Sequence, residues 1–225
     1  MTVLYTILVL IAILLIGFFK IIRTSNKVID KHNFIFDYQQ KFVKFVNSYF
    51  ENHSRFSNIN SSFDGELYMW LTKNVYKVQD ILGHSGTMNY IASFQRFHIP
   101  NYQIVINTLP KFRDSTVEIF DVNSTDDCLL RYLGHLDEII VNSKKTLKNP
   151  FIWFRIGIQE VVSIPLLILK WFGVFSNNAV NKIIGGTFYK IISGIIALIT
   201  LVSGIVTIIV GKDQTIDFIR NIFGK

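Results

Sequence analysis

The chain has 225 residues, half of them apolar, with a formal net charge of +7 and a single cysteine, Cys128. One cysteine excludes an intrachain disulfide framework, and the apolar content exceeds that of ordinary soluble domains. A small disulfide-stabilised or wholly soluble protein is therefore not expected. Cys128 itself lies in an apolar helical pattern, which favours a position in a core.

The first apolar segment, residues 1–19, contains no charged side chain. Basic residues follow it at Lys20 and Arg23, and the segment has neither a basic start nor a cleavage pattern typical of a signal peptide. Positive charge on the C-terminal flank places that flank in the cytoplasm. We therefore predict a transmembrane anchor at residues 1–23, with the N-terminus outside the cell.

Residues 24–149 form the polar part of the chain, and we expect them to be one mainly helical cytosolic domain. Three stretches repeat apolar residues at helical spacing: 33–51, 64–82 and 126–148.

The ends of these helices carry recognisable residues. Asp64 is a suitable N-cap for the second helix, and Gly83 can adopt positive φ after its last turn. Ser124, Thr125 or Asp126 is expected to cap the third helix. Residues 102–109 and 116–122 are β-branched and alternating, so the domain can include a small β-hairpin at these segments.

Residues 81–113 contain no Asp or Glu but hold several basic and aromatic side chains. Basic groups attract phosphate and aromatic rings stack on bases, so this acid-free window is a candidate site for an anionic ligand. Filling of the core by the same rings is the competing interpretation. The candidate ligand-binding residues, including two on the preceding helix, are Lys73, Lys77, His84, Arg96, His98, Lys111 and Arg113.

Enzyme motifs are missing from the sequence. It has no phosphate-binding loop, dinucleotide fingerprint, nucleophile elbow or zinc-type Cys/His spacing, and its five histidines are scattered. We therefore expect a protein that is not an enzyme, with no catalytic residue, no metal and no cofactor.

Residues 150–176 are predicted to form an amphipathic helix with Pro150 in its first turn. One explanation is a helix in the inner interface with its polar arc toward water. The other is a spanning helix whose polar arc faces a partner or a pore. The interfacial helix is favoured. On a helical wheel the arc covers about 140° and holds Arg155, Gln159, Glu160, Ser163 and Lys170.

Residues 191–211 are twenty-one residues without a charge, and as a helix they would extend about 31 Å, enough for a hydrocarbon core of about 30 Å. We predict a transmembrane helix at residues 183–211, followed by a short amphipathic tail at 212–225. One face carries small and hydroxyl side chains, suited either to close helix packing or to lining a polar pathway in an oligomer. That face is formed by Thr200, Ser203, Gly204 and Thr207.

The expected fold class is thus a mostly α integral membrane protein: an N-terminal transmembrane helix, a cytosolic domain, and a C-terminal amphipathic helix plus transmembrane helix. This layout, with residues 149–155 (NPFIWFR) leading into the amphipathic helix, resembles the membrane effectors of bacterial anti-phage defence systems, specifically the Hailong-type transmembrane effector. The resemblance implies a channel-like oligomer in the bacterial inner membrane. It also implies control by a nucleotide or short single-stranded DNA ligand made by a partner nucleotidyltransferase.

The functional expectation is a homo-oligomeric membrane effector that forms a ligand-gated, ion-conducting pore in the lipid bilayer. The alternative is a non-conducting membrane adaptor that recruits a cytosolic partner.

Overall fold

The computed structural model describes residues 2–54, 64–91 and 98–211. Within these ranges it has seven α-helices, one 3₁₀ helix and two strands. The chain divides into two compact units, which are described in turn. A polar unit comprises Lys27–Val141, and an apolar unit comprises Met1–Asn26 with Asn142–Lys225.

Helix α1 (Thr2–Ser54) is continuous, so the predicted anchor and the predicted helix at residues 33–51 belong to one element. The connecting residues contain no proline or glycine that would interrupt it. In its second part the expected apolar face is buried, with Ile35, Tyr38 and Phe45 fully enclosed. The helical periodicity of this region is therefore confirmed.

Helix α2 (Gly65–Leu82) has the predicted caps. The Asp64 side chain accepts a hydrogen bond from the Leu67 backbone N–H at 3.0 Å, and Gly83 has φ of +53°. A β-carbon is disfavoured at that φ, which explains glycine at this position.

The polar unit contains a hairpin, but of the residues predicted as strands only Tyr102 and Gln103 lie in it. After the short 3₁₀ helix η1 (Gly83–Gly86), strand β1 (Thr87–Ile91) pairs antiparallel with β2 (His98–Gln103), with Thr87 opposite Gln103. The pairing is irregular between Met88 and Tyr90.

The two segments predicted as strands are mostly helical. Helix α3 (Ile104–Arg113) buries Ile104, Val105, Thr108, Leu109 and Phe112, a spacing that belongs to a helix face. Pro110, directly after the predicted strand, lies inside α3. Tertiary burial therefore overrides the β-branched composition of residues 102–109.

Helix α4 (Ile119–Thr146) begins earlier than predicted. Ser124, Thr125 and Asp126 lie within it, so the prediction that one of them caps the helix is wrong. Thr125 is buried, and its hydroxyl donates to the Thr108 hydroxyl at 3.1 Å. Cys128 occupies the core, as predicted.

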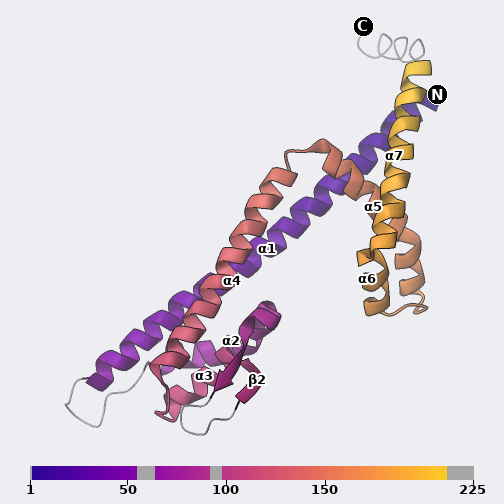
Figure 1. The fold of residues 1–225 in the computed structure, drawn as a ribbon. Coiled ribbons are helices and arrows are strands. Elements are labelled where there is room, and N and C mark those ends of the chain that lie inside the picture. Colours follow the sequence, from indigo (N-terminus) through magenta and orange to yellow (C-terminus); the bar gives the residue numbers. More distant parts are fainter. Residues whose placement is uncertain (1, 55–63, 92–97, 212–225) are drawn as a thin grey trace. The chain divides into compact units, whose positions relative to one another are not determined.

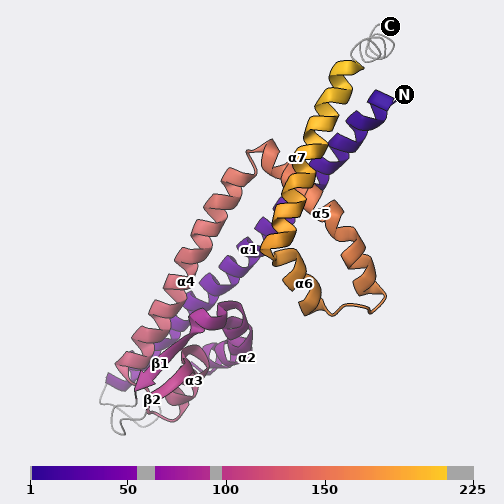
Figure 2. The same ribbon diagram turned by 45° about the vertical axis from the view of Figure 1, so that its right-hand side comes forward.

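The core of the polar unit is formed by α1, α2, α3 and α4. The second part of α1 and the facing part of α4 are antiparallel, since Gln39 bonds to Asp126 at 2.7 Å and His32 meets Asp137 at 3.2 Å. The hairpin lies with α2 and α3 to one side of these long helices (Figure 2). The aromatic centre of this core consists of Tyr38, Phe42, Phe45, Tyr49 and Phe112.

The apolar unit contains α5 (Pro150–Trp171), α6 (Asn177–Gly185) and α7 (Thr187–Val210) together with the start of α1. Asn149 caps α5 and Pro150 occupies its first turn, as expected. The helix predicted at residues 183–211 is divided at Gly185–Gly186, and the short α6 was not predicted. Helix α7 lies beside the beginning of α1 in both ribbon views (Figure 1, Figure 2).

Three helices are long and apolar enough to cross a membrane: α1 over Leu4–Glu51, α5 and α7. Their shared core is small and consists of Ile13, Phe154, Ile158 and Ala197. Most other large side chains on α7 are exposed in the isolated chain, as is typical of helices that face lipid.

Candidate functional site

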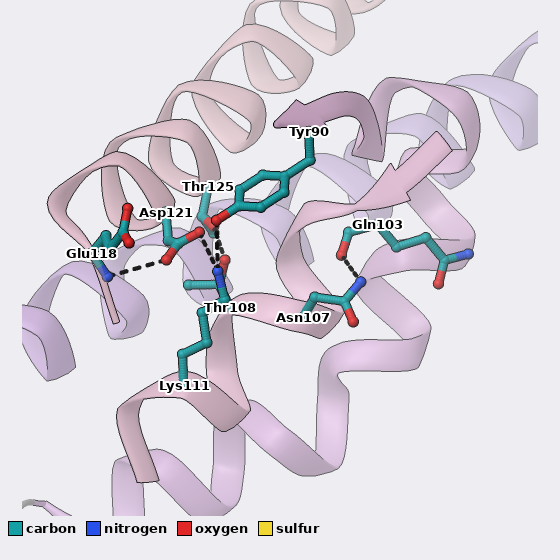
Figure 3. A network of polar contacts seen from close by, with 8 residues as sticks. All are labelled: Tyr90, Gln103, Asn107, Thr108, Lys111, Glu118, Asp121 and Thr125. Atoms are coloured by element: carbon teal, nitrogen blue, oxygen red, sulfur yellow. Dashed lines mark hydrogen bonds and ion pairs between the residues drawn. The ribbon is translucent and has the colours of Figure 1, made fainter. Parts of the chain in front are cut away.

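Lys111 lies at the centre of a polar network between the hairpin, α3 and α4 (Figure 3). Its Nζ donates to Asp121 Oδ1 at 2.7 Å and to the Tyr90 hydroxyl at 3.1 Å. The same ammonium lies 4.7 Å from the centre of the Tyr90 ring. Asp121 is fully buried, so this lysine is its main source of compensating charge.

The environment of Lys111 holds its pKa high. Burial alone would lower the pKa, but the hydrogen bonds with the Asp121 carboxylate and the Tyr90 hydroxyl outweigh it and raise the pKa above its usual range. The second oxygen of Asp121 accepts from the Glu118 backbone N–H at 3.1 Å. The network therefore fixes the first turn of α4 against α3.

In the folded protein, the acid-free window (residues 81–113) is in contact with acidic side chains from outside it. Asp121 follows the window along the chain, yet the fold brings it onto Lys111. Arg113 is also paired, with Asp114 at 3.1 Å, although both side chains are exposed. Two of the predicted anion-binding groups thus already contact carboxylates.

The other predicted ligand residues are spread over several elements. Lys73 is exposed on α2, and Lys77 of the same helix places its Nζ 3.8 Å from the centre of the Phe34 ring. His84 lies in η1 and His98 in β2, both exposed. Arg96 lies outside the described residues.

Two pockets border the hairpin in the polar unit. The α4 pocket, of about 410 Å³, includes the buried Cys128, whose thiol donates to the Ser85 carbonyl at 3.1 Å. Burial raises the pKa of this thiol. The α4 pocket is lined by Ser85, Thr87, Met88, Ile104, Ser124, Asp127, Cys128, Arg131, Tyr132 and His135.

The second, the α2 pocket, has a volume of about 590 Å³ and contains His84 of the predicted set. Its other residues were missed because they come from α2, η1, α3 and both strands of a hairpin that the sequence placed elsewhere. The spacing of Tyr76, Gln79 and Gly83 on one side of α2 was the available signal. The α2 pocket is lined by Tyr76, Gln79, Asp80, Gly83, His84, Thr87, Asn101, Gln103 and Ile106.

In the apolar unit, part of the polar arc of α5 faces other helices. Glu160 pairs with Lys20 of α1 at 3.0 Å. The Gln159 carbonyl accepts from the Tyr189 hydroxyl of α7 at 2.8 Å, and the buried Ser163 hydroxyl donates to the Glu160 carbonyl at 2.7 Å. Arg155 and Lys170 are exposed.

Helices α1 and α5 cross with their backbones in contact. A β-carbon on Gly17 would lie 1.8 Å from the Trp153 carbonyl oxygen, and one on Gly157 would lie 2.0 Å from that of Ile13. Only glycine fits at both positions.

The predicted small-residue face of α7 meets α1. A β-carbon on Gly204 would lie 3.0 Å from Leu10 Cδ1. The Thr200 and Thr207 hydroxyls donate to carbonyls of their own helix, at 2.7 and 2.8 Å. Beside this contact runs a groove of about 450 Å³, the α1/α7 groove, lined by Tyr5, Thr6, Val9, Leu10, Ile199, Thr200, Ser203, Gly204 and Thr207.

The fold and these sites define a helical protein with three candidate membrane spans and a separate polar unit that carries pockets. No protein-family model, curated protein or solved structure matches the chain. Within the described residues, no group of three or more His, Cys, Asp or Glu side chains lies close enough to hold a metal ion.

Proposed function

We propose that the chain is a homo-oligomeric membrane effector that forms a ligand-gated, ion-conducting pore in the bacterial inner membrane, with the polar unit as its cytosolic sensor. The main observation in support of this proposal is the α1/α7 groove. Five hydroxyl side chains line it, from Tyr5, Thr6, Thr200, Ser203 and Thr207, and its lining has no charged residue. Hydroxyl groups between two apolar helices are suited to contact water or ions at membrane depth.

A single chain cannot enclose a conduit with so few helices, so the proposal requires several copies around an axis. Each copy would contribute one α1/α7 groove to the wall. The hydroxyls of Thr200 and Thr207 already have backbone acceptors, and each oxygen retains lone pairs for water or a cation.

Antiviral defence as the setting, and a nucleotide or short single-stranded DNA from a partner nucleotidyltransferase as the controlling ligand, rest on the resemblance to Hailong-type effectors. The contacts of the basic residues indicate where such a ligand would bind. Lys111 and Arg113 already contact carboxylates. Lys73 is exposed, and it precedes Tyr76 of the α2 pocket by three residues, about one helical turn.

Flux from liposomes tests the proposal. In liposomes that contain the purified full-length protein and an ion-sensitive dye, small ions should cross the bilayer. The rate of this ion flux should change when nucleotides or short single-stranded DNA are added. Empty liposomes treated with the same detergent are the control. Oligomers that are fully inserted but give no flux with any of these ligands would contradict the pore.

The adaptor remains the second candidate because of one observation. The small residues Ser193, Ala197 and Gly204 of α7 are already buried within a single chain, and its exposed residues are mostly aliphatic. Such a helix needs no second copy. Mass measurement of the full chain in detergent separates the two functions, since a monomer at all concentrations favours the adaptor and a discrete oligomer favours the pore.

A further inference from the structure

Helix α1 carries a seven-residue repeat on the face that points away from the core of the polar unit. Apolar side chains recur there at every seventh residue, and amide side chains precede three of them by three residues. Alternating steps of three and four residues are those of a coiled coil, with the amides at position a and the apolar side chains at position d. The a positions are Asn33, Gln40 and Asn47, and the d positions are Ile29, Phe36, Val43 and Phe50.

This repeat is separate from the face of α1 that forms the core. Ile35, Phe42 and Phe45 are buried within the polar unit, and they lie roughly 140° around the helix from the centre of the repeat. Phe36 and Phe50 are 50 % and 38 % exposed. The chain therefore buries one apolar face of α1 and leaves a second one largely uncovered.

The length of the repeat distinguishes it from scattered surface side chains. Single exposed apolar residues are ordinary on a protein surface. Here the repeat runs without interruption from Ile29 to Phe50, about 31 Å along the helix, and no charged residue occupies its a or d positions. A continuous apolar stripe of this kind is typical of a surface that another helix covers.

The amides at position a indicate which helix covers it. An amide is both a donor and an acceptor, so a second amide opposite it satisfies both groups. In a parallel, in-register pair of copies, Asn33 lies opposite Asn33 and Asn47 opposite Asn47. Gln40 donates one N–H to Gln39 Oε1 at 2.8 Å and retains its own oxygen and a second N–H for its counterpart.

Other occupants match these amides poorly. In an antiparallel pair, position a of one helix faces position d of the other, which would set Asn33 and Asn47 against apolar side chains. Lipid tails likewise offer no hydrogen-bonding group, and an amide without a partner costs free energy. The alternation of amide and apolar positions therefore favours an identical helix in the same direction.

We propose that this stripe, the α1 seam, is the surface on which a second copy of the chain docks as a parallel coiled coil. The inference rests on the homo-oligomer of the proposed function and names the surface that joins its copies. Helix α1 is one continuous element that starts with a candidate membrane span. Copies inserted into one bilayer in the same sense therefore have parallel α1 helices, as the amides require.

The composition of the α1 seam makes it a weak contact by itself. Polar side chains at position a specify register at a cost in stability. The bilayer holds the copies close together and in one orientation, which raises their effective concentration and compensates for the low intrinsic affinity. The seam therefore joins full-length chains in a membrane.

Disulfide cross-linking of the full-length protein in liposomes tests the seam, with Asn33→Cys and Asn47→Cys as separate variants. A parallel, in-register pair brings both cysteines opposite their counterparts, whereas an antiparallel pair can do so for only one of them. Met69→Cys, on an exposed part of α2, measures cross-linking by random collision. We expect both seam variants to cross-link at least about tenfold faster than Met69→Cys, because the seam raises the local thiol concentration.

A charge in the seam provides the second arm. Phe36→Glu, added to Asn33→Cys, would set a carboxylate between the two helices and should slow cross-linking at least about tenfold. Met69→Glu in the same background is the matched control and should leave the rate unchanged. Both substituted side chains are exposed in the single chain, so the thermal midpoint of the polar unit should stay close to that of the wild type.

Rates no higher than that of Met69→Cys, fast cross-linking at only one of the two seam positions, or insensitivity to Phe36→Glu would overturn the α1 seam. Ion flux from liposomes without cross-linking at the seam would leave the pore proposal standing on another interface. Cross-linking of the expected kind without any flux would support the seam and contradict the pore.

Discussion

At the scale of single residues, Lys111 was predicted to bind an anionic ligand, but it forms an ion pair with the buried Asp121 and so stabilises the fold. Replacing Lys111 by Met leaves Asp121 buried without a compensating charge. We expect a loss of about 3 kcal/mol in the free energy of unfolding, measured by urea titration. Arg113→Met is the matched control because its pair with Asp114 is exposed, and it should leave the free energy of unfolding close to that of the wild type. Equal losses in the two variants would contradict the structural role of Lys111.

Cys128 provides a second prediction at this scale. Burial raises the pKa of its thiol, which also donates to the Ser85 carbonyl. A raised pKa in the folded state means that the thiol's contribution to stability is fully present below its unfolded pKa and declines as the pH rises beyond it. Iodoacetamide reacts with the thiolate, and the native thiol is buried with a raised pKa. Alkylation at pH 8 should therefore be slow in the native protein and rapid in urea. Equally fast labelling in both conditions would show that the thiol is accessible.

At the scale of elements, the α1–α5 crossing depends on Gly17 and Gly157. Gly17→Ala would press a methyl group into the Trp153 carbonyl, and we expect it to destabilise the apolar unit by about 3 kcal/mol or more. Gly194→Ala on α7 is the control, because nothing lies within 4 Å of its β-carbon position. Thermal unfolding of both variants in nanodiscs measures the difference, and an unchanged midpoint for Gly17→Ala would contradict the crossing.

The elements also show what the sequence could predict. Helical periodicity and caps located α2 and the buried face of α1, because local spacing determines both. The hairpin was misplaced, since the β-branched residues Ile104 and Val105 are buried in α3 by tertiary packing, which composition does not encode. The pairing of Asp121 with Lys111 is likewise a contact between elements, and no local pattern indicated it.

At the scale of the whole molecule, the chain combines an apolar unit, whose helices are long and apolar enough to cross a membrane, with a polar unit that has its own core. In the proposed mechanism, ligand binding at the polar unit controls conduction along the apolar unit. The three candidate spans support a location in the membrane. Conduction is proposed from the α1/α7 groove, and the hydroxyls of Thr200 and Thr207 in its lining can be replaced by methyl groups of similar size.

Single-channel recording from the full-length protein in planar bilayers tests this role of the groove, with Thr200→Val and Thr207→Val combined in one variant. The exchange removes two hydroxyls from the lining of the groove. Ile195→Val, on an exposed part of α7, is the control. We expect discrete channels whose conductance falls at least about twofold in the threonine variant, through loss of polar lining, and is unchanged in the control. Absence of channels in the wild type, or equal conductance in all three proteins, would contradict a pore lined by the α1/α7 groove.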